Sequence, residues 1–263
     1  SQQYAQLSAS GYVVAQRRAA VASKATGRLI WLNVREGSKV KQGEIIAKLD
    51  ASDVQAAMAA VQANIRQAEA GVAQANVELV NAESDLQRAQ GLKAQGFLSA
   101  QAMDAATKRV NASKAAITSA KAAVAVARSQ LRVQQVNQDF TEIRAPFDGV
   151  VLNKNANVGD IITPFSSAAG SQGAVVTMAD MTTLEVEADV SESNLAKANI
   201  GQPVEITLDA LPDVRFRGSI AGIVPTVDRA KATVMPKIRF EKLDPRILPE
   251  MSAKVTILSQ AAT

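Results

Sequence analysis

Residues 54–89 read VQAAMAAVQANIRQAEAGVAQANVELVNAESDLQRA, and this stretch decides the fold. Its apolar and small residues recur at alternating steps of four and three, which is the heptad spacing of a helix that packs one narrow seam against a partner helix. The larger seam residue returns every seven positions, and the seam residue between is almost always alanine or serine, so the two backbones are expected to approach closely. The seam positions are Val54, Met58, Val61, Ile65, Ala68, Val72, Ala75, Leu79, Ala82, Leu86 and Ala89.

The same pattern returns in residues 103–131, MDAATKRVNASKAAITSAKAAVAVARSQL. Between the two seams, Gly96 suits a left-handed C-terminal cap and Ser99 suits the N-cap of a second helix. The sequence therefore predicts an antiparallel helical hairpin over residues 51–138, with paired arms that form a coiled coil. Arms of about 40 residues make a rod about 60 Å long, and its alanine- and glutamine-rich outer faces favour contact with a partner.

The composition removes most enzyme chemistry. There are no histidines and no cysteines, which excludes imidazole and thiol nucleophiles, zinc fingers and iron–sulfur clusters. No acidic loop of the EF-hand kind is present, so we expect no metal, no cofactor and no catalytic residue. The net charge is +4 without a block of lysine and arginine, which argues against nucleic acid as a partner.

The segments on both sides of the hairpin are rich in valine, isoleucine and glycine, and they match each other. Residues 43–46 (Gly-Glu-Ile-Ile) on one side correspond to residues 159–162 (Gly-Asp-Ile-Ile) on the other. Short strands with glycine corners in two similar halves are typical of a small β-sandwich. We expect residues 12–50 and 139–181 to form its two halves, with the hairpin inserted between them.

Residues 182–258 alternate apolar and polar positions in several short runs separated by glycine and proline, which predicts a small antiparallel barrel. Residues 1–11 are expected to be a stub of a membrane-proximal region and residues 259–263 a C-terminal tail. The chain begins at Ser1 without a methionine, and we expect a membrane anchor to belong to the full-length protein.

Three stretches, residues 34–50, 144–151 and 186–209, resemble the periplasmic adaptor (membrane fusion protein, HlyD-type) family of bacterial efflux and secretion pumps. Residues 249–255 are similar to the family's closing barrel strand, although Glu250 stands where glycine is more usual. The resemblance implies an elongated α+β fold, in which an antiparallel coiled-coil hairpin interrupts a lipoyl-like β-sandwich and a small β-barrel follows.

The resemblance also implies a function. Such an adaptor lies in the periplasm at the inner membrane, forms a homo-oligomeric ring, expected to be a hexamer, and links an inner-membrane transporter to a TolC-like outer-membrane channel. It is not an enzyme. The likeness to macrolide-exporter-type (MacA-like) members favours an ABC-type transporter and leaves an RND-type transporter open.

At the hairpin tip the family has an arginine, a leucine four residues later and a serine seven beyond, which contact the channel. Arg88, Leu92 and Ser99 stand at these spacings. The alternative is structural, with Arg88 as a solvated charge, Leu92 as the last apolar contact of the seam and Ser99 as an N-cap. In MacA-like adaptors a loop glutamine forms a ring inside the channel, and Gln172 is the matching candidate beside the alternative of a surface loop without a role.

Two other functions stay open at this level. A lipoyl-like fold also suits a biotin or lipoate carrier, but Lys24 lacks the expected neighbours for modification, since Ser23 precedes it. A cytosolic structural coiled-coil protein is the second alternative. Modification of a lysine would identify the first, and export with membrane association of the full-length protein would exclude the second.

Overall fold

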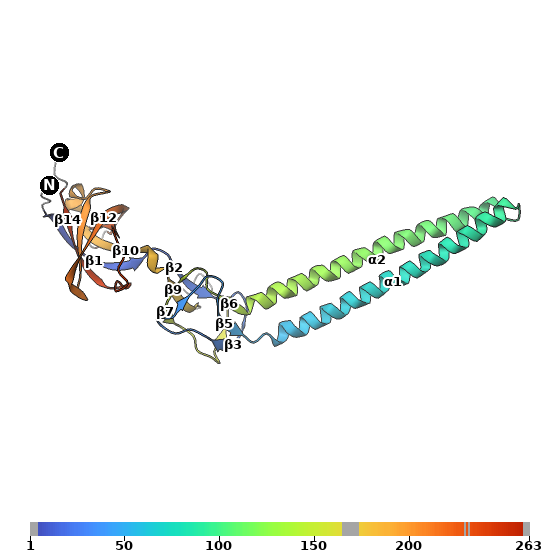
Figure 1. Cartoon of the computed structure of the whole chain (residues 1–263), viewed down its shortest axis with the longest axis horizontal. Coiled ribbons are helices and arrows are strands. Elements are labelled where there is room, and N and C mark those ends of the chain that lie inside the picture. Colours follow the sequence, from blue (N-terminus) through green and yellow to red (C-terminus); the bar gives the residue numbers. More distant parts are fainter. Residues whose placement is uncertain (1–4, 165–173, 229, 231, 260–263) are drawn as a thin grey trace.

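The computed structural model describes residues 5–164, 174–228, 230 and 232–259. The molecule is elongated, with a β-barrel at one end, a smaller pair of β-sheets in the middle and two long helices that reach the other end (Figure 1). Within the described residues, neither helix is both long enough and apolar enough to cross a membrane.

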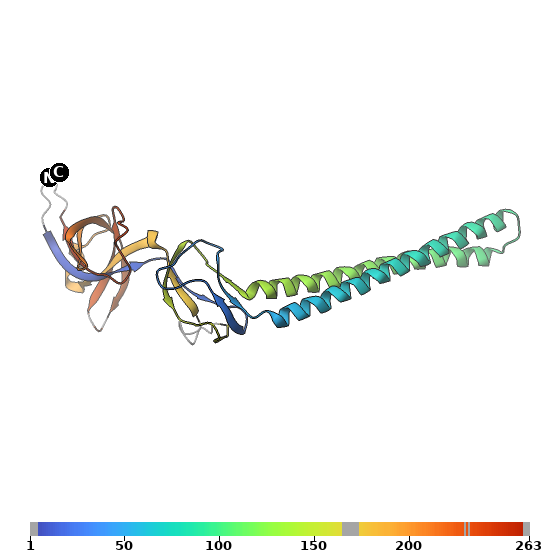
Figure 2. The same ribbon diagram turned by 60° about the horizontal axis from the view of Figure 1, so that its bottom comes forward.

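The rod consists of α1 (Ser52–Ala94) and α2 (Ala100–Phe140), which run side by side in opposite directions (Figures 1 and 2). Every position of the two expected seams is buried or half-buried, while nearly all others on the helices are exposed. This periodicity is the reason for the pairing, because neither helix has another apolar face to cover. The fully buried helix residues all lie at seam positions, namely Val61, Ala82, Val110, Ser113, Val124 and Ala127.

Two four-stranded sheets form the sandwich-like middle part. One has the order β2-β9-β7-β4 and the other β6-β5-β3-β8, so each sheet takes strands from before and after the rod. The strands are β2 (Arg18–Ala22), β3 (Gly27–Leu32), β4 (Lys39–Val40), β5 (Ile45–Leu49), β6 (Glu142–Arg144), β7 (Gly149–Lys154), β8 (Ile161–Ile162) and β9 (Ala174–Ala179).

The matching Gly-acid-Ile-Ile segments lead into β5 and β8, which lie on either side of β3 in one sheet. Leu29, Ile46 and Met178 are fully buried between the sheets. Helix α1 begins soon after β5, and α2 ends directly before β6. Because β5 and β6 are paired, the base of the rod is connected to two neighbouring strands of this sheet.

The other end is a closed barrel with the strand order β1-β10-β13-β12-β11-β14. Its core is aliphatic, with Val186, Ile206 and Val255 completely buried, and Phe216 packs edge-on against Phe240. The strands are β1 (Ala5–Ala15), β10 (Leu184–Ser191), β11 (Pro203–Leu208), β12 (Leu211–Asp228), β13 (Thr233–Phe240) and β14 (Ser252–Leu258); the short 3-10 helices η2 (Met181–Thr183) and η3 (Glu192–Lys197) flank β10.

The expectation for the N-terminal residues is wrong where the structure describes them. Ala5–Ala15 is neither a stub of another region nor part of the sandwich, because as β1 it pairs with β10 on one side and β14 on the other. Val13 and Ala15 are buried inside the barrel, and the strand closes what would otherwise be two open sheet edges.

Two crossing segments join the barrel to the sheets. The N–H of Gln16 donates to the carbonyl of Thr183 (3.0 Å), and the N–H of Asp180 donates to the carbonyl of Arg17 (2.8 Å). The Arg17 guanidinium lies 4.5 Å from the centre of the Phe147 ring. The two segments that connect the barrel to the middle sheets are therefore hydrogen-bonded to each other, and Arg17 also contacts the middle part through Phe147.

Candidate functional site: the tip and faces of the hairpin

The tip turn is a Schellman motif. Gly96 has a φ of 77°, in the left-handed region that glycine adopts without strain. Its N–H donates to the carbonyl of Lys93 (3.0 Å), and the N–H of Phe97 donates to the carbonyl of Leu92 (2.9 Å). These two bonds satisfy the last carbonyls of α1 and reverse the chain within a few residues.

Ser99 begins the second helix. Its Oγ accepts a hydrogen bond from the N–H of Ala102 (3.1 Å), so the serine is an N-cap, as the structural alternative expected. The residue is exposed, and its hydroxyl proton is still available to a partner. Capping and docking are therefore compatible roles for Ser99.

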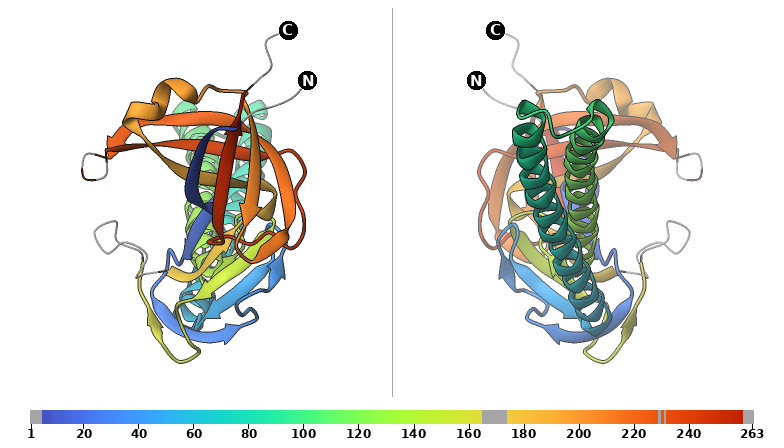
Figure 3. Two further views of the ribbon diagram at one scale, coloured as in Figure 1. Left: turned by 90° about the vertical axis from the view of Figure 1, so that its left-hand side faces the viewer. Right: turned by 90° about the vertical axis from the view of Figure 1, so that its right-hand side faces the viewer.

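Arg88 and Leu92 lie one turn apart on α1 and share a face of that helix. The Arg88 side chain is 70% exposed, and its Nη1 donates to Asp85 Oδ1 (3.2 Å). Leu92 is 39% exposed, which agrees with the expectation that the turn uncovers it. The turn between α1 and α2, seen end-on in Figure 3, is one end of the molecule. Arg88, Leu92 and Ser99 lie in the chain on either side of this turn, and their contact with a channel stays a prediction.

The sequence reasoning missed Phe97. This side chain is 76% exposed, more than any other large apolar residue in the described part of the chain. The available signal was its place directly after Gly96, as the single aromatic residue of the helical stretch. An exposed phenylalanine at the end of a rod is an apolar surface without a partner in this chain.

An ion-pair network ties the two helices together just below the tip. Arg109 on α2 donates to Glu78 (2.9 Å) and to Asp85, both on α1, and Asp85 also receives Arg88. The hydrogen bonds from Glu78, and next from Asp85, raise the pKa of the Arg109 guanidinium above its usual value. Since all of these groups are partly exposed, the network contributes more to helix register than to stability.

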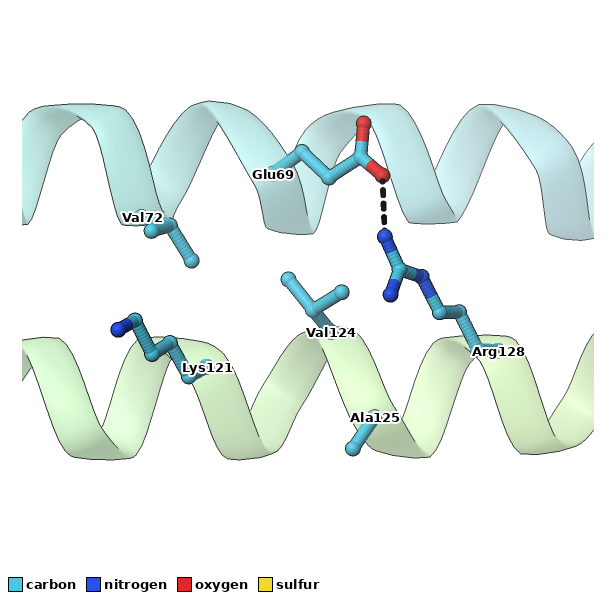
Figure 4. Close-up of a pocket in the computed structure, with 6 residues that line it drawn as sticks. All are labelled: Glu69, Val72, Lys121, Val124, Ala125 and Arg128. Carbon is cyan, nitrogen blue, oxygen red and sulfur yellow. Dashed lines mark hydrogen bonds and ion pairs between the residues drawn. The ribbon is translucent and has the colours of Figure 1, made fainter.

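Further along the rod an open groove lies between the helices (Figure 4), where Val72 and Val124 point toward each other. At one end of the groove Arg128 donates to Glu69 (3.2 Å). Its lining consists of the seam residues Val72 and Val124, the Glu69–Arg128 ion pair, and Lys121 and Ala125 on α2, so the groove belongs to the helix–helix contact.

The outer faces of the rod carry exposed valines. Val77 and Val80 on α1 are each more than half exposed, and so are Val126 and Val133 on α2. Within the described residues, no group of three or more acidic, histidine or cysteine side chains is placed to bind a metal ion. The exposed valines therefore offer packing surfaces on both helices of the rod.

The two remaining sequence candidates differ in outcome. Gln172 lies outside the described residues. Lys24 is exposed in the bend between β2 and β3, and its ammonium lies 5.3 Å from the Phe140 ring at the base of the rod. A lysine that rests on α2 is poorly placed to swing a cofactor between sites.

Comparison with known proteins agrees with this architecture. Residues 17–179 match the family model described as "RND MFP, barrel-sandwich hybrid domain", and residues 183–261 match "CusB-like, beta-barrel domain". The macrolide export protein MacA of Yersinia pestis is 31% identical over 251 residues, which cover 95% of this chain and 67% of that protein. The multidrug resistance protein MdtA of Pectobacterium carotovorum is 27% identical, over 95% of this chain and 57% of its own length.

Solved structures support the same fold. The crystal structure of MacA from Actinobacillus actinomycetemcomitans superimposes with a TM-score of 0.81 at 18% identity, over 98% of this chain and 80% of that one. The membrane fusion protein Spr0693 of Streptococcus pneumoniae gives 0.61 at 23% identity, over 97% of this chain and all of that one. With the first family model covering more than half of the residues, the chain is a MacA-like member of the membrane fusion protein family of periplasmic adaptors.

Proposed function

We propose that the full-length protein links an inner-membrane transporter to a TolC-like outer-membrane channel for efflux or secretion, without catalysing a reaction itself. The observation that carries this proposal is the match of residues 17–179, hairpin included, to the adaptor domain model. The similarity to macrolide export proteins favours an ABC-type transporter. The description of the barrel-sandwich model as an RND domain keeps an RND-type transporter as the alternative.

The rod is proposed to be an antiparallel coiled coil, and the middle sheets to be a lipoyl-like sandwich. Burial at every expected seam position supports the coiled coil. Small residues such as Ala82 and Ala127, both nearly inaccessible to solvent, let the helices lie close together. The mixing of strands from both sides of the rod within each sheet supports the sandwich.

Self-association into a ring, expected to contain six copies, follows from the same surfaces. The outer faces of α1 and α2 present exposed alanine, serine and valine, including Val77 and Val126. Such faces lower their free energy when they pack against the next copy, because apolar area leaves water. The hairpins would then pack side by side around a central conduit. The ring would lie in the periplasm, held at the inner membrane by an anchor outside this chain.

Docking at the channel is assigned to Arg88, Leu92 and Ser99. The arginine offers a planar fork of donors to carbonyls or carboxylates, Leu92 offers apolar area, and Ser99 offers its hydroxyl. Gln172 remains the candidate for a ring inside the conduit, on the family resemblance alone.

The test is Leu92→Asp in the full-length protein. The exposed position tolerates the change, so the melting temperature should stay nearly unchanged, while a carboxylate at the contact should abolish export. Ile200→Asp, which adds the same charge at a 71% exposed residue of the barrel part, serves as the control for added charge. Normal export by correctly expressed Leu92→Asp protein would show that the tip is not the channel contact.

A further inference from the structure

The barrel and the middle sheets are joined by one ribbon of two strands. Ala15 pairs with Leu184 at the end of the barrel, and Arg18 pairs with Ala179 at the start of the sheet β2-β9-β7-β4. Between these pairs the two crossing segments stay joined by backbone hydrogen bonds, although one is two residues long and the other four. The 3-10 helix η2 takes up the difference, as the extra residues of a β-bulge do.

Thr183 fixes the irregular part of the ribbon. Its Oγ1 accepts a hydrogen bond from the N–H of Arg17 (3.0 Å) and donates one to the carbonyl of Asp180 (2.7 Å). The Asp180 carboxylate closes the same turn, because it accepts from the N–H and the hydroxyl of Thr182 (3.0 and 2.6 Å). It also lies 3.8 Å from the Arg17 guanidinium. One hydroxyl, that of Thr183, therefore joins both strands at the level of η2.

Gln16 and Arg17 are neighbours in the chain, but their side chains contact different parts of the molecule. Gln16 Oε1 accepts from the Lys237 ammonium (2.7 Å), and its Nε2 donates to Glu187 (3.3 Å), both on strands of the barrel. The Arg17 guanidinium lies over the ring of Phe147, which is buried in the core of the middle sheets. Adjacent residues of an extended strand point to opposite faces, so one face of the ribbon is held by the barrel and the other by the middle part.

Apolar contact between the two parts is small within the described residues. From the middle part, Ala179 belongs to the barrel core and Leu152 packs against it, together with Met181 of η2. Arg18 also pairs with Glu250 across the junction, but both side chains are more than half exposed. Domains joined without a large apolar interface are expected to move relative to each other. The ribbon and its side-chain contacts are therefore what can hold the angle between the two parts.

We propose that Gln16, Arg17 and Thr183 form a junction clamp, which makes the barrel and the middle sheets move as one body. The clamp resists bending toward either face of the ribbon, because its side chains hold the barrel on one face and the middle part on the other. The inference goes beyond the proposed function, since it needs neither a transporter nor a channel. One consequence does rest on that function: a rotation of the barrel would be carried to the base of the rod.

The experiment measures the distance between two spin labels by double electron–electron resonance. The chain has no cysteine, so labels can be attached at Asn33→Cys in the middle part and Lys254→Cys in the barrel, both exposed positions. The full-length protein is studied in detergent, and labelled copies are diluted with an excess of unlabelled protein, so that distances between copies do not contribute. With the clamp intact, we expect one narrow distance distribution.

Gln16→Ala with Arg17→Ala should broaden the distribution about twofold or more, because the ribbon can then bend toward either face. Arg66→Ala with Gln67→Ala removes the same two residue types from exposed positions of α1 and should leave the width unchanged. Arg17→Lys keeps a cation near the Phe147 ring, so it should broaden the distribution less than Arg17→Ala does. The melting temperature should change little in these variants, because the clamp lies between the two parts and not inside either.

Two results would overturn the proposal. A broad or two-peaked distribution with the clamp intact would show that the two parts already move. A double variant with an unchanged width and a normal melt would show that the side chains do not hold the angle. If the double variant fails to fold, Arg17→Ala alone decides by the same criterion. None of these measurements involves export, so failure of the clamp and failure of the adaptor function are distinguishable.

Discussion

Glu250 occupies a backbone position that suits glycine. Its φ is 68°, in the left-handed region, while its N–H donates to the carbonyl of Val13 (2.7 Å) and so fixes the turn before β14. The side chain lies 3.7 Å from Arg18, but both groups are well exposed and the pair contributes little. This geometry gives a physical reason for the glycine that the family more usually has here.

We therefore expect Glu250→Gly to raise the free energy of unfolding by about 1 kcal/mol, because the left-handed strain is released. The matched opposite change is Gly201→Ala, at a φ of 87° with no atom close to the added Cβ, which should lower it by a similar amount. Urea unfolding measures both. A loss of stability in Glu250→Gly would mean that the contact with Arg18 outweighs the strain.

At the scale of elements, the rod depends on one seam, and neighbouring residues on α1 differ in how far they are buried in it. Leu79 is a half-buried seam residue, whereas its neighbour Val80, about 100° further around α1, is 62% exposed. A charge at these adjacent positions therefore meets two different environments. Replacing Leu79 or Val80 by aspartate introduces the same charge in both cases, so the comparison tests the helix register.

Leu79→Asp should open the rod locally and lower the helical circular dichroism and the melting temperature, since a partly buried, unpaired carboxylate costs several kcal/mol, on the order of 2–4. Val80→Asp should change the melt little. We expect Ile65→Asp, at another seam position, to behave like Leu79→Asp. Equal melts for Leu79→Asp and Val80→Asp would contradict the register.

The ion pairs across the rod act at the same scale. Arg109 reaches Glu78 and Asp85, and Arg128 reaches Glu69, so α2 holds α1 at two levels. Exposed pairs such as these contribute roughly 0–1 kcal/mol each. Stability comes mainly from the seam, and the pairs fix which residues lie opposite one another.

For the whole molecule, the proposed ring is testable because the chain has no cysteine. Val72 points toward Val124 across the groove (Figure 4). Ala73 and Ala122 lie within two positions of these valines in the chain. Both are exposed and lie outside the seams, Ala73 on α1 and Ala122 on α2. Cysteines at these positions would face the neighbouring copies rather than each other.

We expect the full-length protein with both Ala73→Cys and Ala122→Cys to give a ladder of linked copies up to the hexamer when a short bismaleimide is added to membranes. Ala73→Cys alone should stop at single copies. Native-mass analysis of the linked product would give the number of copies. Reactive cysteines that yield no species above the monomer would contradict side-by-side packing of the hairpins.

The sequence by itself determined the rod and its tip. The seam from Val54 to Ala89, the cap at Gly96 and the N-cap at Ser99 are all set by spacings of three or four residues, and such contacts form within one helical turn. The barrel strands after residue 182 were also predictable from their alternation, and so was the exposure of Leu92. These features depend on residues close together in the sequence, so they can be predicted without knowing the tertiary structure.

Only the tertiary structure decided where Ala5–Ala15 belongs and how the sheets combine strands from both sides of the rod. Strand pairing uses backbone hydrogen bonds that are alike for every residue, here between segments more than 90 positions apart, so no local pattern specifies the partner. The exposure of Phe97 was likewise hidden, because it depends on how the turn after α1 directs this side chain.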